Sequence, residues 1–421
     1  MCIDRAEGIP PRCKGLHAAL CLFLLGPGTG SIAAEPGSGS FAEAVADGEV
    51  GIAFRYRFEH VDQDNFDEDA NASTARLRLN YETASYKGWS SLVEFDYVTD
   101  VLMDDFNPGD GLNPDRTDFP VVADPSGPDL NQFFVDYNGV DEALFRIGRQ
   151  RIVLDNQRFV GGVGWRQNEQ TFDGASLRYS GWGNTELQYS YVSQVNRIFG
   201  EKSAAGQHNG NIHLLHANAL LPAGWTLTGY GYVIDNDDVA TFSTATFGVR
   251  GSGKLMLGGQ TFDLVGEYAT QSDTASAPVS YRADYWRLDA TWIASETLTL
   301  GVTYERLGGD DSAPGKAFRT PLATLHAFQG WADQFLVTPD AGIRDLFFSL
   351  TWVRAGWTLQ TAWHQFSADA GSRDWGQELD VSLARSFNDY YGVLMKAAAF
   401  DADDAPYANV TKFWLMFTAN Y

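Results

Sequence analysis

The segment that decides the fold is Phe54-Arg55-Tyr56-Arg57-Phe58, in which aromatic residues alternate with arginines. Successive side chains of a β-strand point to opposite faces, so the three rings lie on one face and the two guanidinium groups on the other. The inner face of a water-soluble sandwich would have to be the apolar one. A membrane barrel inverts that arrangement, with its apolar face toward lipid and its polar face toward a wet interior. The segment therefore favours a lipid-facing β-barrel strand.

The same period-two alternation recurs along the chain, and no period of 3.6 residues appears that would indicate helices. One parity carries Leu, Val, Phe, Tyr and Trp, whereas the other carries small, polar or charged residues. This asymmetry predicts lipid outside and water inside. Clear examples are Ala75-Arg76-Leu77-Arg78-Leu79, Val93-Glu94-Phe95-Asp96-Tyr97, Leu187-Gln188-Tyr189-Ser190-Tyr191, 298–304 and 346–352.

Reading these segments in order predicts eighteen strands, whose ends are uncertain by about 2–4 residues. Short connections containing Gly, Pro, Asp or Ser alternate with long ones, as periplasmic turns alternate with outer loops in such barrels. We therefore expect an all-β fold, a single transmembrane antiparallel β-barrel of 18 strands with short periplasmic turns, long extracellular loops and a lumen wide enough for water. The expected strands are 50–60, 73–84, 88–99, 130–139, 142–151, 172–180, 184–194, 210–220, 224–234, 241–249, 258–270, 281–293, 297–306, 344–354, 356–367, 375–385, 390–400 and 410–421.

The two ends of the chain indicate delivery to the outer membrane of a Gram-negative bacterium. Arg12 and Lys14 precede an apolar stretch of about ten residues and then a small-residue segment, which predicts a cleaved signal peptide over 1–34. Residues 35–49 are expected to form a short periplasmic segment, and 50–421 the barrel. The last strand ends on Tyr421 and resembles the C-terminal assembly signal of outer-membrane proteins, so we expect the barrel-assembly machinery, outer-membrane lipid and lipopolysaccharide as partners.

The remaining composition is consistent with this class. All three cysteines (Cys2, Cys13 and Cys21) precede the expected cleavage point, as suits a chain that crosses the oxidising periplasm. No apolar run after residue 40 approaches the ~20 residues of a membrane helix. The formal charge of −24 comes partly from acid clusters such as 62–69, which we interpret as solvated loops. Binding of Ca²⁺ by these loops is a weaker alternative, and no other cofactor or metal and no nucleic acid is expected.

The inward parity supplies candidate pore-lining cations. We expect a basic face that selects anions, although acids of the same parity (Glu94, Asp96, Asp136, Asp263, Glu267, Asp289, Glu305, Glu378 and Asp380) leave open a wall of structural ion pairs. The candidate cations are Arg55, Arg57, Arg76, Arg78, Arg146, Arg178, Arg287 and Lys396.

Two long loops look specialised. Residues 148–174 are basic, Gly-rich and amide-rich and include Arg149, Arg151 and Arg166, which suit carboxylates or sugar hydroxyls. An ordered loop folded over the rim is the alternative. Residues 320–335 are too apolar to lie loose in water, so we expect them to pack into the barrel mouth. There they would plug the mouth, form a constriction, or present Trp331 and Phe328 to a carbohydrate.

Three blocks in these loops resemble the alginate-export family of outer-membrane barrels. They are GRQRIVLDNQRF (148–159), WRQNEQTFDGASL (165–177) and TPLATLHAFQGWADQF (320–335). The resemblance implies an 18-stranded barrel with an electropositive lumen that conducts an anionic uronate polymer. The late turn at 386–389 is short here, whereas the polysaccharide exporters of the family have an extended one, so polymer export is less secure than anion permeation.

Three functions follow as hypotheses. The first is a channel for an anionic polysaccharide or oligosaccharide, and the second is a general or nutrient-uptake porin for small anionic solutes. An enzyme is not expected: His213 and His216 fall on opposite parities, and His364 has no evident Ser or Asp partner at matched depth.

Overall fold

The computed structural model describes residues 39–421, which form one short helix followed by a single sheet. The helix is α1 (Phe41–Ala46), and short 3₁₀ turns cover Pro114–Arg116, Pro222–Gly224, Ala240–Phe242 and Leu325–Ala327. The eighteen strands within residues 39–421 are β1 (Glu49–Gln63), β2 (Ala70–Glu82), β3 (Trp89–Asp105), β4 (Gly127–Val140), β5 (Ala143–Gln150), β6 (Thr171–Trp182), β7 (Thr185–Asn196), β8 (Gln207–Leu220), β9 (Thr226–Asn236), β10 (Thr244–Leu257), β11 (Gln260–Asp273), β12 (Arg282–Ile293), β13 (Leu298–Leu307), β14 (Ile343–Arg354), β15 (Trp357–Ser367), β16 (Asp374–Phe387), β17 (Tyr391–Ala402) and β18 (Val410–Asn420).

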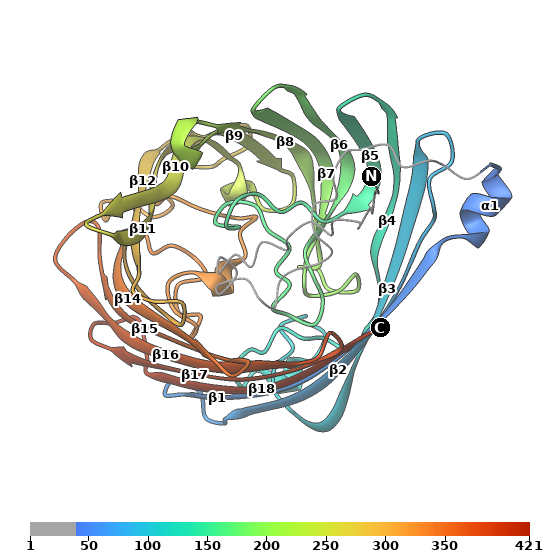
Figure 1. Cartoon of the computed structure of the whole chain (residues 1–421). Helices are drawn as coiled ribbons and strands as arrows, with labels where there is room; N and C mark the ends of the chain where they lie inside the picture. Colours follow the sequence, from blue (N-terminus) through green and yellow to red (C-terminus); the bar gives the residue numbers. More distant parts are fainter. Residues whose placement is uncertain (1–38) are drawn as a thin grey trace.

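The sheet closes on itself. Each strand pairs antiparallel with its neighbours in sequence, and β1 pairs with β18 to complete the ring seen in Figure 1. Closure leaves no strand edge unpaired, which a barrel in hydrocarbon requires. The expected fold class is therefore confirmed, and every expected strand corresponds to one observed strand.

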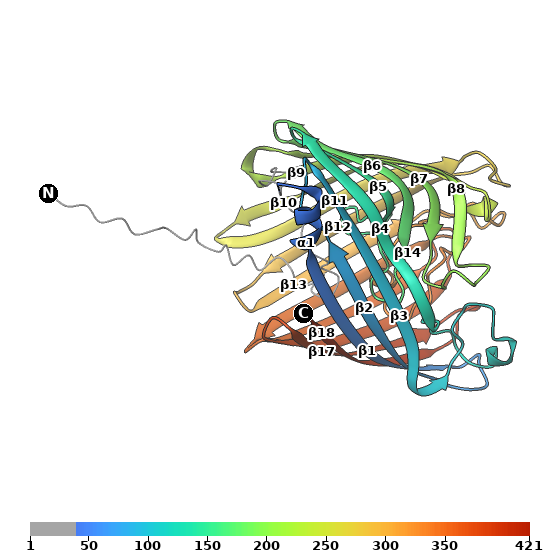
Figure 2. The same cartoon turned by 90° about the vertical axis from the view of Figure 1, so that its right-hand side faces the viewer.

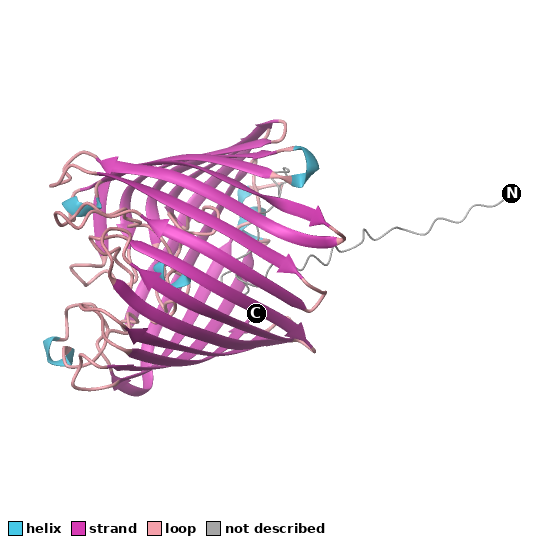
Figure 3. Cartoon of the chain, turned by 90° about the vertical axis from the view of Figure 1, so that its left-hand side faces the viewer, coloured by secondary structure: helices cyan, strands magenta, loops and turns pink. Residues whose placement is uncertain are grey.

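The connections at the two ends of the barrel differ in length, as expected. Tight turns such as 141–142 and 258–259 lie at the end that carries α1 and Tyr421, and long loops such as 106–126 and 308–342 lie at the other (Figures 2 and 3). Short turns mark the periplasmic side. Both ends of the described chain thus lie on the periplasmic side.

The largest error in the expected strand ends concerns β10, which was expected at 241–249 and runs from Thr244 to Leu257. Its second half places Gly251 and Gly253 on the outward parity, where a strand is recognised in the sequence by large apolar side chains. The ladder with β11 nevertheless continues through Gly251↔Gly266 to Leu257↔Gln260.

The expected signal peptide lies outside the described residues. Of the expected periplasmic segment, residues 41–46 form α1, which Ser40 caps by accepting a hydrogen bond from the Glu43 amide. Within residues 39–421, no helix combines the length and the apolar character needed to cross a bilayer.

The inward and outward parities are as expected. On β1 the side chains of Phe54 and Ile52 are exposed on the outer surface, whereas Arg55 and Arg57 are 6% and 1% exposed. A barrel of this size would hold water if it were empty. These arginines are buried because other parts of the chain fill the lumen beside them.

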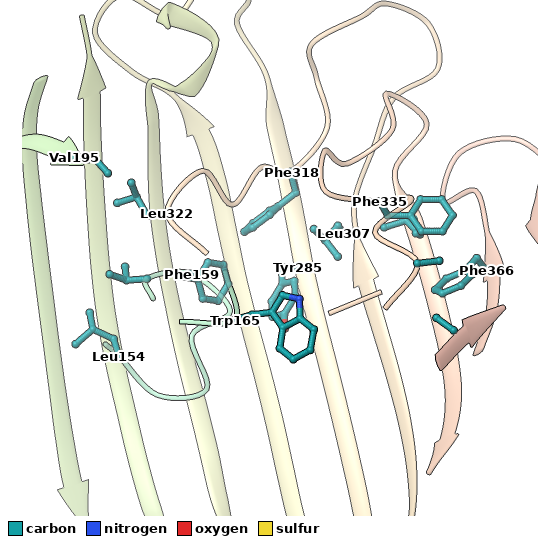
Figure 4. Close-up of a cluster of buried hydrophobic side chains, with 14 of the residues drawn as sticks. Leu154, Phe159, Trp165, Val195, Tyr285, Leu307, Phe318, Leu322, Phe335 and Phe366 are labelled. Atoms are coloured by element: carbon teal, nitrogen blue, oxygen red, sulfur yellow. The ribbon is translucent and has the colours of Figure 1, made fainter. Parts of the chain in front are cut away.

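Two loops fold inward to fill it, residues 151–170 (the first inner loop) and residues 308–342 (the second inner loop). Together with inward side chains of the wall they form an apolar cluster inside the barrel. Figure 4 shows Phe159 of the first loop beside Phe318 of the second and Tyr285 of β12, and Phe335 beside Phe366. The expectation that residues 320–335 pack into the barrel is therefore confirmed.

Candidate functional site

The two inner loops are joined to each other by backbone pairing. Val160 and Leu322 form a parallel bridge, and the Gly161 amide donates to the Leu322 carbonyl at 2.9 Å. The Gln170 amide group donates to both the Gly161 and the Leu322 carbonyls, each at 2.9 Å. Displacement of one loop therefore disturbs the other.

The first inner loop is bound to the wall by arginines of β1 and β2. Arg55 donates to the carbonyls of Gly164 and Arg166, and Arg57 donates to that of Trp165. Arg76 donates to the Gln167 carbonyl at 3.0 Å. Consecutive carbonyls of one loop thus accept from arginines that were expected to face water.

Between this loop and the periplasmic end of the barrel lies a cavity of about 480 Å³, which we call the vestibule. Its lower rim belongs to the periplasmic end, at residues such as Gly51, Asn80 and Asn388. Its inner part is charged, with four arginines and two glutamates. These are Arg55, Arg76, Arg78, Arg151, Glu94 and Glu169.

Arg78 and Arg151 each contact acids in the vestibule. Arg78 holds Asp96 through two hydrogen bonds of 2.7 and 2.6 Å, and also donates to Glu169 at 2.8 Å. Arg151 donates to both Glu94 and Glu169. Burial alone would raise the pKa of Glu169, but Arg151, Arg78 and Arg76 outweigh it and hold that pKa well below its usual range.

Arg57 does not line the vestibule. Its guanidinium binds the buried carboxylate of Asp124, which also accepts from the Gln167 amide at 2.8 Å. Arg166 likewise binds Glu59 at 3.0 Å and Asp333 at 3.3 Å. The structure therefore places both residues in buried ion pairs that hold the loops, as the ion-pair alternative foresaw.

The other candidate arginines lie elsewhere on the wall. Arg146 pairs with Asp136 at 2.7 Å, and Arg149 with Asp173 at 2.8 Å and Glu201 at 3.0 Å. Arg287 pairs with Asp289 at 2.9 Å and lies 3.5 Å from Glu305. Arg178 is half-buried on β6, where its Nε is without a hydrogen-bond partner among the described residues. Of the arginines expected to line the pore, the vestibule gathers only Arg55, Arg76, Arg78 and Arg151.

Trp331 belongs to an aromatic cage around Lys396 at the tip of the second inner loop. The Lys396 ammonium lies 3.7 Å from the centroid of Trp331 and 4.3 Å from that of Trp165, and Trp414 is 5.3 Å away. The same ammonium is 2.7 Å from His326 Nε2. Trp331 thus binds a cation of the chain itself.

His326 and Asp333 lock this tip to the wall. His326 Nδ1 and Asp333 Oδ1 are 2.7 Å apart, and Lys412 donates to the other carboxylate oxygen at 2.9 Å. Burial lowers the pKa of His326 to about 3, assisted by Lys396 and Arg166 and opposed by Asp333. The ring is therefore neutral, so Nδ1 donates to Asp333 and Nε2 accepts from Lys396.

His364 contacts two aspartates of the neighbouring strands: its Nδ1 lies 3.0 Å from Asp345 and its Nε2 lies 3.7 Å from Asp380. Neither aspartate is at matched depth, because Phe347 of β14 and Glu378 of β16 are the residues paired with His364 and each aspartate lies two residues away. The histidine ring also stacks on Phe347 and Phe366, so its contacts are those of a packed lumen residue.

No metal site emerges from residues 39–421, where no group of three or more His, Cys, Asp and Glu side chains is placed to hold an ion. Calcium binding by the outer loops stays a hypothesis.

Sequence reasoning missed several residues that organise the site. Glu169, His326 and Asp333 all lie within the quoted blocks, so a search for titratable residues in those blocks could have singled them out. Asp124 lies in a loop with no distinguishing pattern, and its pairing with Arg57 spans 67 residues.

Comparison with known proteins supports the fold and finds a family resemblance over part of the chain. The family model described as "Alginate export" matches residues 28–197. Among solved structures, OccK9 (OpdG) of Pseudomonas aeruginosa superposes with a TM-score of 0.68 at 15% identity, covering 90% of this chain and 99% of that one. OccAB2 of Acinetobacter baumannii gives 0.70 at 15% identity, with the same coverage of 90% and 99%. OpdK of Pseudomonas aeruginosa, solved with vanillate, gives 0.69 at 12% identity and again 90% and 99% coverage. A comparison with curated proteins finds no match.

A closed antiparallel barrel with an apolar outer surface and a charged lumen defines this chain as a bacterial outer-membrane β-barrel. Its resemblance to the alginate-export family is confirmed on the matched residues 28–197.

Proposed function

We propose that the channel passes an anionic polysaccharide or oligosaccharide, of the alginate-like uronate kind, through its partly basic lumen. The observation that carries the proposal is the vestibule, where four arginines converge on a space of about 480 Å³. Guanidinium groups bind carboxylates through paired, charge-assisted hydrogen bonds, so a uronate is a fitting ligand.

Two of these arginines are better placed than the rest to meet a solute. Arg55 and Arg76 line the cavity and donate mainly to backbone carbonyls, and the acid nearest Arg76 is Glu169 at 3.7 Å. Their charge is thus less completely neutralised than that of Arg78, which holds Asp96 and Glu169. A carboxylate entering the vestibule would be attracted most strongly toward this side.

The amides at the rim suit the sugar rather than the acid. Asn80, Asn388 and Asn420 lie among the lining residues nearer the periplasmic end. Amide groups donate and accept hydrogen bonds, as sugar hydroxyls require. The turn between β16 and β17 is only three residues long, at 388–390. The polysaccharide exporters of the family have an extended turn at this place. We therefore favour passage of short uronate chains over export of a long polymer.

A second candidate is a porin for small anionic solutes. The observation in its favour is the fold likeness to OpdK, whose structure was solved with vanillate, a carboxylate. The same arginines would serve either solute, and only the size of the ligand differs.

Swelling of proteoliposomes separates the two candidates. We expect galacturonate dimers and trimers to permeate faster than neutral oligosaccharides of equal length, because the vestibule attracts their carboxylates. Arg76→Ala is expected to remove this advantage. Arg250→Ala is the matched control, since Arg250 lies on β10, outside the vestibule, and pairs with Glu267 at 2.9 Å. Exclusion of every oligomer, with entry of monomeric carboxylates, would instead support the small-solute porin.

A further inference from the structure

The first inner loop carries its own carboxylate into the cluster of vestibule arginines. Glu169 Oε1 lies 2.8 Å from Arg78 and 3.7 Å from Arg76, and its other oxygen accepts from Arg151. Asn131 donates to that second oxygen at 3.3 Å. Glu169 is 8% exposed and lines the cavity. It meets the donors that a carboxylate solute would need.

We propose that Glu169 is an internal substitute for the anionic substrate, and that an incoming carboxylate displaces it and releases the first inner loop from the wall. The proposal rests on the proposed function, because it assumes that uronates reach the vestibule arginines. It adds that a bound uronate opens the channel by releasing the first inner loop.

The neighbours of Glu169 provide the route from displacement to opening. Gln167 holds the same turn to the wall, accepting from Arg55 at 2.9 Å and donating to Thr74 Oγ1 at 2.9 Å. Gln170 holds it to the second inner loop through the Leu322 carbonyl. A shift of residues 167–170 therefore loosens both attachments, and with them the apolar packing that fills the upper lumen.

Glu94 provides a comparison within the same cavity. Its carboxylate also contacts Arg151 and lies 3.6 Å from Arg78, but it belongs to β3, which is fixed by pairing with β2 and β4. Glu94 and Glu169 thus carry the same charge against the same arginines, one on the rigid wall and one on the inner loop. Neutralising either adds the same charge to the vestibule, but only Glu169 connects that charge to the loop.

The experiment measures the flux of a neutral sugar while an anion is offered. Proteoliposomes carrying wild-type channel swell in sucrose, with and without galacturonate trimer. If the trimer only binds, it obstructs the pore and slows sucrose entry. If it displaces Glu169, sucrose entry accelerates, and the loss of even one of the charge-assisted contacts of Glu169 predicts an effect of about tenfold.

The variants distinguish release from a general charge effect. Glu169→Gln is expected to show fast sucrose entry without the trimer and no further acceleration with it. Glu94→Gln is expected to keep slow basal entry and to respond to the trimer as the wild type does. Equal behaviour of the two variants would overturn the proposal.

A thiol at the interface of the two loops reports release directly. Val160 is 1% exposed and pairs with Leu322, so Val160→Cys, in a chain with Cys2, Cys13 and Cys21 changed to Ser, should react slowly with a soluble maleimide. Galacturonate trimer is expected to speed that reaction about tenfold. If Glu169→Gln fails to fold, the labelling of Val160→Cys in a chain that keeps Glu169 still tests whether the trimer releases the loop.

The outcomes separate this proposal from the proposed function. Trimer that binds and slows sucrose entry, with no change in labelling, overturns the displacement while leaving uronate passage intact. Trimer that neither permeates nor alters sucrose entry contradicts both.

Discussion

Arg57 shows that a lumen-facing arginine need not serve a solute. Its alternation with Phe58 predicts its direction, and the structure places it inward as expected. Its partners, Asp124 and the Trp165 carbonyl, come from two loops that the strand pattern does not describe. Parity therefore predicts which way a side chain points, whereas the loops decide what it meets there.

Arg57→Ala is expected to destabilise the barrel strongly. The change leaves the Asp124 carboxylate buried without its main counter-ion, and breaking such a pair typically costs about 3–5 kcal/mol. The free energy of unfolding of the detergent-folded protein, from a guanidinium titration, measures this. Arg116→Ala is the control, because its ion pair with Asp104 at 2.8 Å is at the surface, with side chains 30% and 64% exposed, and should cost less than about 1 kcal/mol. Equal losses in the two variants would contradict the structural role of Arg57.

His326 predicts a loss of stability in acid. Its pKa is lowered by burial to about 3, below the ordinary value of 6.5. Between these values the unfolded chain binds the proton and the folded one does not, so stability falls as the pH drops from about 6.5 toward 3. The melting temperature should therefore decline between pH 6.5 and 5 more steeply in the wild type than in His326→Gln. Parallel curves over this interval would show that His326 is not buried in its neutral form.

At the scale of elements, the strands were predictable, whereas the contacts of the inner loops were not. The alternation in 54–58 and its repeats located all eighteen strands of residues 39–421, because side-chain period and lipid contact are local properties. The pairing of Val160 with Leu322 joins residues that no periodic pattern relates. For 320–335, its apolar composition predicted burial inside the barrel but did not identify Glu378 or Lys396 as its contacts.

Gly330 sets the position of the second inner loop. Its φ is +79°, and a Cβ added there would lie 2.3 Å from Glu378 Oε2. The carboxylate cannot easily withdraw, because Glu378 is buried and accepts from the Ala332 amide at 2.7 Å. The loop tip must therefore move if any side chain is added.

Gly330→Ala is expected to lower the melting temperature and to increase the frequency of opening events in single-channel recordings. Gly259→Ala is the control, since Gly259 has a nearly equal φ of +77° in a periplasmic turn with nothing within 4 Å of the added Cβ. Both variants carry the backbone strain of about 1–2 kcal/mol, but only the first carries the collision. If the two behave alike, contact with Glu378 does not position the loop.

At the scale of the whole molecule, the charge is distributed unevenly. The chain carries a formal charge of −24, and many of its acids lie in outer loops, whereas the inner part of the vestibule brings four arginines against Glu94 and Glu169, with Asp96 bound to Arg78 and Asp389 among the other lining residues. Burial strengthens this local field, because the loops and the wall exclude water and thereby weaken screening. The lumen and not the overall charge should therefore decide which ions pass.

The zero-current potential of wild-type channels in a planar bilayer, under a KCl gradient, tests the basic vestibule most directly. The account predicts a potential whose sign shows chloride to be the more permeant ion, reduced toward zero in the combined Arg55→Ala, Arg76→Ala and Arg78→Ala variant and retained in Arg250→Ala. A potential of cation-selective sign in the wild type, or one that the triple substitution leaves unchanged, would contradict it.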